Sequence, residues 1–305
     1  MVTLLVDVNN NTVTGFPRGD GISVQGANTA SATAPAGTYG TPGGAPVTIT
    51  GNFVSGDATN KLNGFGISAS VTGRGQGNFV ITNNGTAGSP LRNMKSSAIA
   101  IGAAGNVTTY FTVTGNQISA NNGFSSPGLA LGTDRNIQAD LSVLASPVVR
   151  ATITNNSISN TSGSGVRVLH RDSNGSLDLR LENNTITNVL GNLAGIRVEN
   201  GSSGSVTYNP TMCASIASNN AASGAVDGFG DKNAGINLYK GSASATTYKF
   251  GLTGLSPSPA TNPQVEAHLT TLNPLSATGL GFFAGRKVAV RTGSNYTSCT
   301  LPAGV

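Results

Sequence analysis

One short pattern recurs along the chain and limits what the chain can fold into. It reads apolar, polar, then Asn, Gly or Ser, then Asn, any residue, apolar, and it occurs seven times, two of the copies being weaker. The asparagines at its fourth position are Asn11, Asn52, Asn84, Asn116, Asn156, Asn184 and Asn219. A repeat of this length indicates a solenoid, because one unit cannot bury its apolar face alone whereas stacked units can.

A second pattern, Gly-apolar-any-apolar, follows each copy of the first. It begins at Gly21, Gly66, Gly128, Gly165, Gly195 and Gly235, and in the remaining copy Ser97 or Ala98 replaces the glycine. Both patterns alternate with period two, so each predicts a short strand with one inward face. Two strands in a fixed order, seven times, predict an all-β fold: a right-handed parallel β-helix of about seven turns.

Stacked turns place equivalent strands side by side in parallel sheets, so their inward residues form columns. One predicted column is Val8, Ile49, Ile81, Val113, Ile153, Leu181 and Ile216, and a second is Ile22, Ile67, Ile99, Leu129, Val166, Ile196 and Ile236. We expect the seven asparagines to form a ladder at a corner, where Asn bonds the corner backbone and tolerates left-handed φ. Extra residues leave the coil as loops, as in 25–46 and 119–127.

The repeat stops after residue 240, which predicts a β-helix over residues 1–240 and a small C-terminal capping region over 241–305. Residues 262–272 read as a short helix with Asn262 as N-cap and Pro263 at its first position, and 288–290 offer a final strand. The chain begins mid-turn with no capping element, so we expect a fragment of a longer exported protein. Cys213 and Cys299 fit either one disulfide or two free thiols, and export favours a disulfide that ties the tail to the last turn.

Composition narrows the classes of function. Charged residues are only 10% of the chain, and the 37% that are hydrophobic fall in short regular runs, so the chain is not disordered. The net charge of +5 comes without a run of Lys or Arg, which argues against a nucleic-acid partner. The sequence has no apolar stretch long enough for membrane insertion, and its first residues are not a signal peptide.

The Gly-Ile-x-Val strands, the Asn-Asn-x-Ile turns and the terminal block from 212–216 through 298–302 resemble a family of bacterial surface and secreted proteins with parallel β-helix repeats. The resemblance covers nearly all of the chain. It implies an extracellular or cell-surface location and an adhesin-like role. Its partners would be other copies of the chain, neighbouring β-helix turns, or surface glycans or proteins. The same fold also carries polysaccharide lyases, glycoside hydrolases and phage tailspikes, so fold alone does not decide function.

The acidic residues argue against catalysis. A lyase of this fold needs an acidic Ca²⁺ cluster with a basic proton acceptor, and a glycosidase needs two facing carboxylates. The chain has 12 Asp and Glu, spread thinly, and its two histidines lie far apart in sequence, so we expect no catalytic residues, no metal and no cofactor. The first hypothesis is a non-catalytic structural or adhesive segment that self-associates end to end. The alternative is a carbohydrate-active β-helix, either a glycan-binding module or a polysaccharide depolymerase.

Residues 150–200 form the densest polar region and hold the candidate ligand-contact face. Arg167 and Arg197 occupy the same repeat position on adjacent turns and should stack outward, with His170 and Arg171 close by. Such a face suits an anionic glycan or a partner protein. The competing interpretation is a solvated face with cross-turn ion pairs, among which we expect Arg150 with Asp178.

Two further motifs have no assigned role. Arg18-Gly19-Asp20 spells an integrin-type tripeptide, which often arises by chance. Thr-x-Thr recurs at Thr48/Thr50, Thr112/Thr114 and Thr152/Thr154, with Val80/Thr82 between them and Arg180/Glu182 after them. Flat Thr ladders could order water or bind ice, but Thr also suits any exposed strand face.

Overall fold

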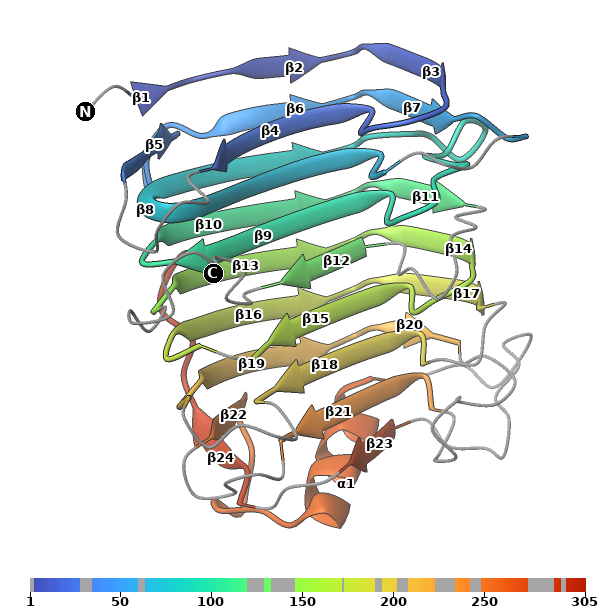
Figure 1. The fold of residues 1–305 in the computed structure, drawn as a ribbon. Coiled ribbons are helices and arrows are strands. Elements are labelled where there is room, and N and C mark those ends of the chain that lie inside the picture. The colour runs from blue at the N-terminus through green and yellow to red at the C-terminus, as the bar shows by residue number, and fades with distance from the viewer. Residues whose placement is uncertain are drawn as a thin grey trace.

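The computed structural model describes residues 3–27, 35–59, 64–119, 129–132, 146–171, 173–189, 194–201, 208–222, 234–241, 248–273, 288–291 and 295–305. The chain winds as a right-handed parallel β-helix, with the N-terminus at one end of the coil and the single described helix near the other (Figure 1). Every ladder between named strands in the described part is parallel. The predicted fold class is therefore confirmed.

Three stacks of strands make the sides of the coil. The first sheet contains β1 (Thr3–Leu4), β2 (Asp7–Asn9), β5 (Pro35–Tyr39), β6 (Val47–Thr50), the second half of β8 (Ile67–Thr82), β10 (Thr108–Thr114), β13 (Val148–Thr154), β16 (Ser176–Glu182), β19 (Thr211–Ala217), β22 (Lys249–Thr253) and β24 (Thr297–Cys299). The second side contains β3 (Thr12–Phe16), β7 (Phe53–Gly56), β11 (Gln117–Ser119), β14 (Ser157–Thr161), β17 (Thr185–Val189) and β20 (Asn220–Ala221). The third sheet contains β4 (Ile22–Ala27), the first half of β8, β9 (Ile99–Gly105), β12 (Leu129–Gly132), β15 (Val166–His170), β18 (Ile196–Asn200), β21 (Ile236–Lys240) and β23 (Val288–Arg291).

The core includes most members of the two predicted aliphatic columns, together with further buried side chains such as Phe79, Phe111 and Ile186. In the first sheet Ile153 is the Cα partner of Val113 on one side and of Leu181 on the other, and all three side chains are fully buried. In the third sheet the column from Ile22 to Ile236 keeps the predicted register at every step. Each turn packs only against the turns next to it, so the removal of these side chains from water is the main contribution to the stability of the coil.

The coil continues past residue 240, so the predicted boundary at 240/241 is wrong. Three further strands extend the parallel sheets: β22 pairs with β19, β23 with β21, and β24 with β22. Between β22 and β23 in the chain, α1 (Asn262–Leu272) covers this end of the coil and lies beside β23 (Figure 1). The helix begins one residue earlier than predicted, with Thr261 as N-cap, whose backbone N–H donates to Gln264 Oε1 over 2.9 Å.

Residues 25–46 do not all leave the coil as a loop, which corrects a second expectation. The segment contains the end of β4 and all of β5, and β5 pairs in parallel with β8 and β1. Residues 28–34 and 120–127 lie outside the described residues.

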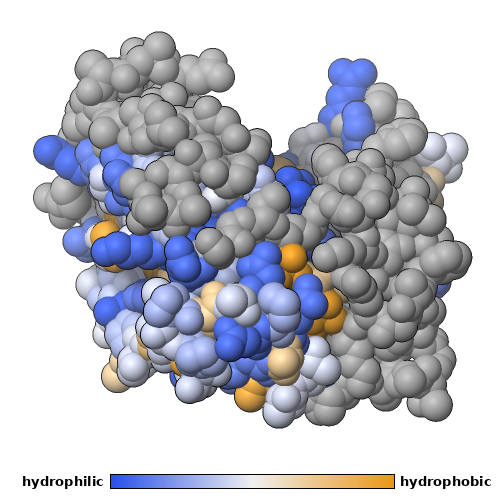
Figure 2. Space-filling model, turned by 90° about the horizontal axis from the view of Figure 1, so that it is seen from below, coloured by the Kyte–Doolittle hydropathy of each residue, from blue (hydrophilic) through white to orange (hydrophobic). Residues whose placement is uncertain are grey.

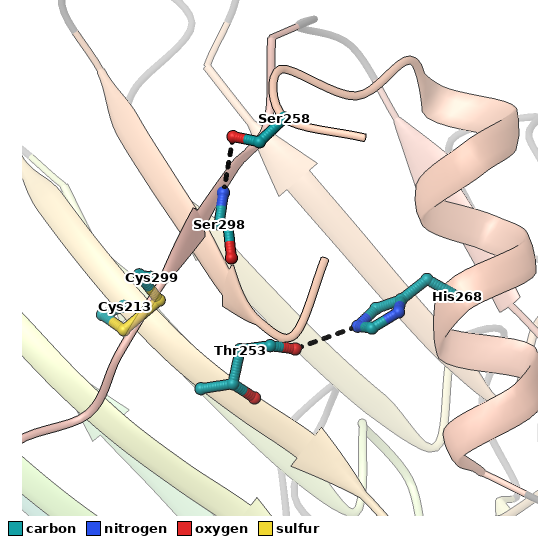
Figure 3. The surroundings of a disulfide bond; sticks show 6 residues. All are labelled: Cys213, Thr253, Ser258, His268, Ser298 and Cys299. Carbon is teal, nitrogen blue, oxygen red and sulfur yellow. Dashed lines mark hydrogen bonds between the residues drawn. A yellow bond between two sulfur atoms is a disulfide. The ribbon is translucent and has the colours of Figure 1, made fainter. Parts of the chain in front are cut away.

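Three contacts tie α1 and the tail to the last turns (Figure 3). Cys213 of β19 and Cys299 of β24 are joined by a disulfide bond, 86 residues apart in sequence. His268 Nε2 of α1 lies 3.1 Å from the carbonyl oxygen of Thr253. The backbone N–H of Ser298 donates to Ser258 Oγ over 2.9 Å. The end of the rod that α1 covers presents mostly hydrophilic side chains among the described residues (Figure 2).

Removing the disulfide is expected to destabilise the protein. A crosslink restricts the unfolded chain and typically contributes about 2–4 kcal/mol, toward the upper end for a long loop. We expect the Cys213→Ser/Cys299→Ser variant to lose that much unfolding free energy in urea. Reductant should lower the wild type to the same value and leave the variant unchanged. Equal stability of variant and wild type would show that the crosslink contributes nothing.

Candidate functional site

The third sheet brings two of the predicted ligand-contact residues together. Arg167 of β15 and Arg197 of β18 are Cα partners on adjacent turns, and both side chains are half-buried on the outer face. Arg171, which directly follows β15, is also half-buried. Three guanidinium groups therefore come from neighbouring turns at one side of the rod.

Carboxylates neutralise much of the charge in this region. Arg197 Nε forms an ion pair with Glu199 Oε1, and the Glu199 side chain is only 5% exposed. Arg150 Nε lies 3.8 Å from Asp178 Oδ2, and Arg180 lies 3.8 Å from Glu182. The Arg150 and Arg180 pairs lie on the first sheet and the Arg197 pair on the third, so the second interpretation, ion pairs within and between turns, accounts for these three arginines.

The pair Arg150 and Asp178 shows how partly buried charges coexist here. Burial raises the pKa of Asp178, and the nearby Arg150 guanidinium works in the opposite direction. The same guanidinium lies 4.9 Å from the centre of the Tyr110 ring, close enough for a cation–π contact. Tyr110, Arg150 and Asp178 are consecutive Cα partners, so each side chain contacts a neighbour on the next turn.

His170 does not belong to an outer contact face, and its predicted role is wrong. It is the fifth residue of β15, so it shares the inward side with Val166 and Val168, and it is fully buried. Burial lowers its pKa to about 3, with a smaller opposing contribution from the Asn200 side chain. The imidazole is therefore neutral at physiological pH and out of reach of an external ligand.

His170 begins a buried polar column that sequence reasoning missed. Its Cα partner on the next turn is Asn200, and the partner of Asn200 is Lys240; all three are at most 1% exposed. Ser173 Oγ lies 3.3 Å from His170 Nε2, Asn200 Nδ2 donates to Lys249 O over 2.8 Å, and Lys240 Nζ lies 3.4 Å from Asn295 O. Burial lowers the pKa of Lys240. The column fastens chain segments at the corner between the third and first sheets.

The signal for this column was present in the sequence. His170, Asn200 and Lys240 each stand five residues after the glycine that opens the second pattern, at Gly165, Gly195 and Gly235. Period two makes that position inward, like the two apolar positions before it. The arginines close to His170 in sequence suggest a charged surface cluster, but the period-two pattern of the strand predicts that its side chain points inward.

The seven predicted asparagines form a continuous ladder at the corner after the first sheet. In each step the backbone N–H and the side-chain Nδ2 of one asparagine both donate to Oδ1 of the next, over 2.9–3.1 Å. From Asn52 onward, Nδ2 also donates to the carbonyl of the aliphatic core residue one turn back, as Asn156 does to Val113 O over 3.0 Å. From Asn52 to Asn219 these side chains are at most 1% exposed.

The ladder has one more member than predicted. Asn273, the C-cap of α1, accepts from the N–H and Nδ2 of Asn219 over 2.9 and 3.1 Å and donates to Ile216 O over 2.9 Å. Asn273 lies 54 residues after Asn219 and follows a helix, so the repeated strand pattern does not mark it. The helical turn thus closes the ladder with the same chemistry that the strands use.

Left-handed φ belongs to the residue before each ladder asparagine, not to the ladder asparagine itself, which corrects the expectation. These residues are Asn10, Gly51, Asn83, Gly115, Asn155, Asn183 and Ser218, with φ between 53° and 68°. Asn and Gly are the residues that adopt this conformation most readily, which explains the third position of the first pattern.

The Arg18-Gly19-Asp20 tripeptide is bonded to the next turn. Asp20 Oδ1 accepts from the backbone N–H of Phe65 over 2.9 Å, and the carbonyl of Gly19 accepts from Gly64 over 2.7 Å. The Asp20 side chain, which an integrin-type motif would present to a receptor, is half-buried and accepts a hydrogen bond from the next turn instead.

The protein-family models, curated proteins and solved structures that were searched contain no match to this chain. Within the described ranges, no group of three or more His, Cys, Asp or Glu side chains could hold a metal ion. The helix that the structure describes is too short and too polar to span a bilayer.

Proposed function

We propose that this chain is a non-catalytic structural or adhesive segment of an exported bacterial surface protein, serving as a rigid spacer or contact face. The observation that carries the proposal is the unbroken ladder from Asn11 to Asn273, in which every step repeats the same two hydrogen bonds. Fully satisfied buried polar networks rigidify a fold. Three outer arginines, Arg150, Arg180 and Arg197, pair with carboxylates, as expected of a surface that stabilises the rod.

The disulfide supports the exported location. Cys213 and Cys299 are bonded, and such bonds persist in oxidising surroundings such as the cell surface or the extracellular space.

The two ends of the described coil differ, and the difference supports end-to-end association. At one end α1 and Asn273 close the ladder. At the other, Leu4 and Leu5 are 45% and 56% exposed, and no described residue donates to Oδ1 of the exposed Asn11. Unpaired strand edges and exposed aliphatic side chains favour pairing with a β-helical turn of another copy. Two such edges that meet would form a dimer with closed symmetry.

Sedimentation velocity over a concentration series tests this association. We expect the wild-type chain to populate a dimer and the Leu4→Lys/Leu5→Lys variant to remain monomeric, because the added charges oppose burial of the edge. Val148→Lys is the matched control: Val148 is 43% exposed but lies on the side of the rod. A wild type that stays monomeric, or a Leu4→Lys/Leu5→Lys variant that still dimerises, would contradict the proposed contact.

A further inference from the structure

Threonines on the outer face of the first sheet form one continuous array over four turns. One column runs Thr48, Val80, Thr112 and Thr152, and the next runs Thr50, Thr82, Thr114 and Thr154. Each residue is the Cα partner of the next, so seven of eight neighbouring positions carry a threonine. We call these eight residues the threonine face.

The threonine face is uncharged and ordered. Thr50 Oγ1 lies 3.0 Å from Thr82 Oγ1, and Thr114 Oγ1 lies 3.0 Å from Thr154 Oγ1, so neighbouring hydroxyls hold one another in place. All eight side chains are half-buried, as expected where a side chain stands among close neighbours on a sheet. Charged residues border the array: Asp7 before it, Arg180 and Glu182 after it, and Arg150 beside Thr152 on the same face of β13.

The strands beneath the threonine face cannot easily shift. On each strand, the residue between the two positions of the threonine face points to the opposite side and is fully buried. These residues are Ile49, Ile81, Val113 and Ile153. On each of these turns, a ladder asparagine stands two residues after the threonine of the second column. The threonines therefore repeat at about 4.8 Å from strand to strand and about 6.6 Å along each strand.

We propose that the threonine face binds ice. The hydroxyls hold a layer of water at fixed spacings close to those of oxygen atoms in ice, and the methyl groups restrict how that water can reorient. Charged side chains would instead orient water around themselves, and none occupies the eight positions. A protein partner would find no aromatic or Arg anchor on these positions, and a nucleic acid would find no cation.

Thermal hysteresis and inhibition of ice recrystallisation test the proposal with the full chain. We expect the wild type to shape ice crystals and to show hysteresis. Thr112→Tyr should lose most of that activity, because a ring in the middle of the array displaces the ordered water. The matched control is Thr187→Tyr, which puts the same ring on a half-buried threonine of the second side and should leave the activity unchanged. Circular dichroism checks that both variants keep the β spectrum.

A gain-of-function variant keeps the test decisive should Thr112→Tyr fold poorly. Val80→Thr completes the eighth position of the array with a residue of similar size and should increase hysteresis. A wild type without hysteresis or crystal shaping would overturn the proposal. So would loss of activity in Thr187→Tyr equal to that in Thr112→Tyr, or a Val80→Thr variant no more active than the wild type. Adsorption to a crystalline glycan without adsorption to ice would assign the face to another ligand and also overturn it.

Discussion

Replacing Asn156 by alanine is expected to lower the free energy of unfolding by about 4 kcal/mol, because several buried polar groups lose their partners at once. Asn116 N and Nδ2 lose the oxygen that accepts both of their hydrogen bonds. Val113 O loses the donor Nδ2 of Asn156, and Asn184 Oδ1 loses one of its two donors. Since Asn156 is only 1% exposed, water cannot replace these bonds without opening the coil.

Asn155→Gly is the control for this substitution. Asn155 precedes the ladder residue and has a φ of 57°, and the equivalent positions at residues 51 and 115 are already glycine with φ of 68°. We therefore expect little change for Asn155→Gly. Equilibrium unfolding in urea compares the two variants under the same conditions. If the two variants differ by less than about 1 kcal/mol, the ladder does not stabilise the coil as its hydrogen bonds indicate.

Acid is expected to destabilise the protein through His170. The pKa of His170 is about 3 in the folded state, below the value of 6.5 for an unperturbed histidine. Below pH 6.5 the unfolded chain therefore binds a proton that the folded chain excludes, and stability falls as the pH falls from 6.5 toward 3. Each pH unit in this window costs about 1.4 kcal/mol from this one group, and above pH 6.5 the group has no further effect.

The variant His170→Asn isolates this effect. It copies the side chain that the next turn carries at Asn200, so the column keeps a buried amide that does not titrate. Unfolding free energies measured from pH 7.5 to pH 4 should fall less steeply for His170→Asn than for the wild type. His268→Asn, at the only other histidine of the chain, should keep the acid slope of the wild type because His170 is intact. Parallel slopes for all three proteins would show that His170 is not the acid-sensitive group.

The sequence predicted the coil and its columns residue by residue, because each prediction rested on a pattern repeated in neighbouring turns. Ile153 and Leu181 lie in the predicted register, and Asn156 and Asn184 meet as the ladder requires. A strand with period two and a buried face leaves one register that keeps every apolar side chain inside. Repetition therefore provided the information that a single strand lacks.

Features outside the repeat were the ones missed. Asn273 joins the ladder through the end of a helix, where no alternating pattern marks it. β22 extends the first sheet although the asparagine pattern does not recur before it. His170 was assigned to the surface because charged residues flank it in sequence, yet strand parity buries it. A polar residue at an inward position does not follow the hydrophobic pattern, so only its spacing from Gly165 could have placed His170 inside.

Native-state hydrogen exchange tests most directly whether the asparagine ladder is continuous through the rod. The backbone amides of Asn52, Asn84, Asn116, Asn156, Asn184 and Asn219 donate to buried ladder oxygens. We predict that these amides exchange at a common slow rate set by global unfolding, and that the amide of the exposed Asn11 exchanges faster. If the Asn116 or Asn156 amide exchanged as quickly as that of Asn11, the ladder could not be a continuous stabilising column of the coil.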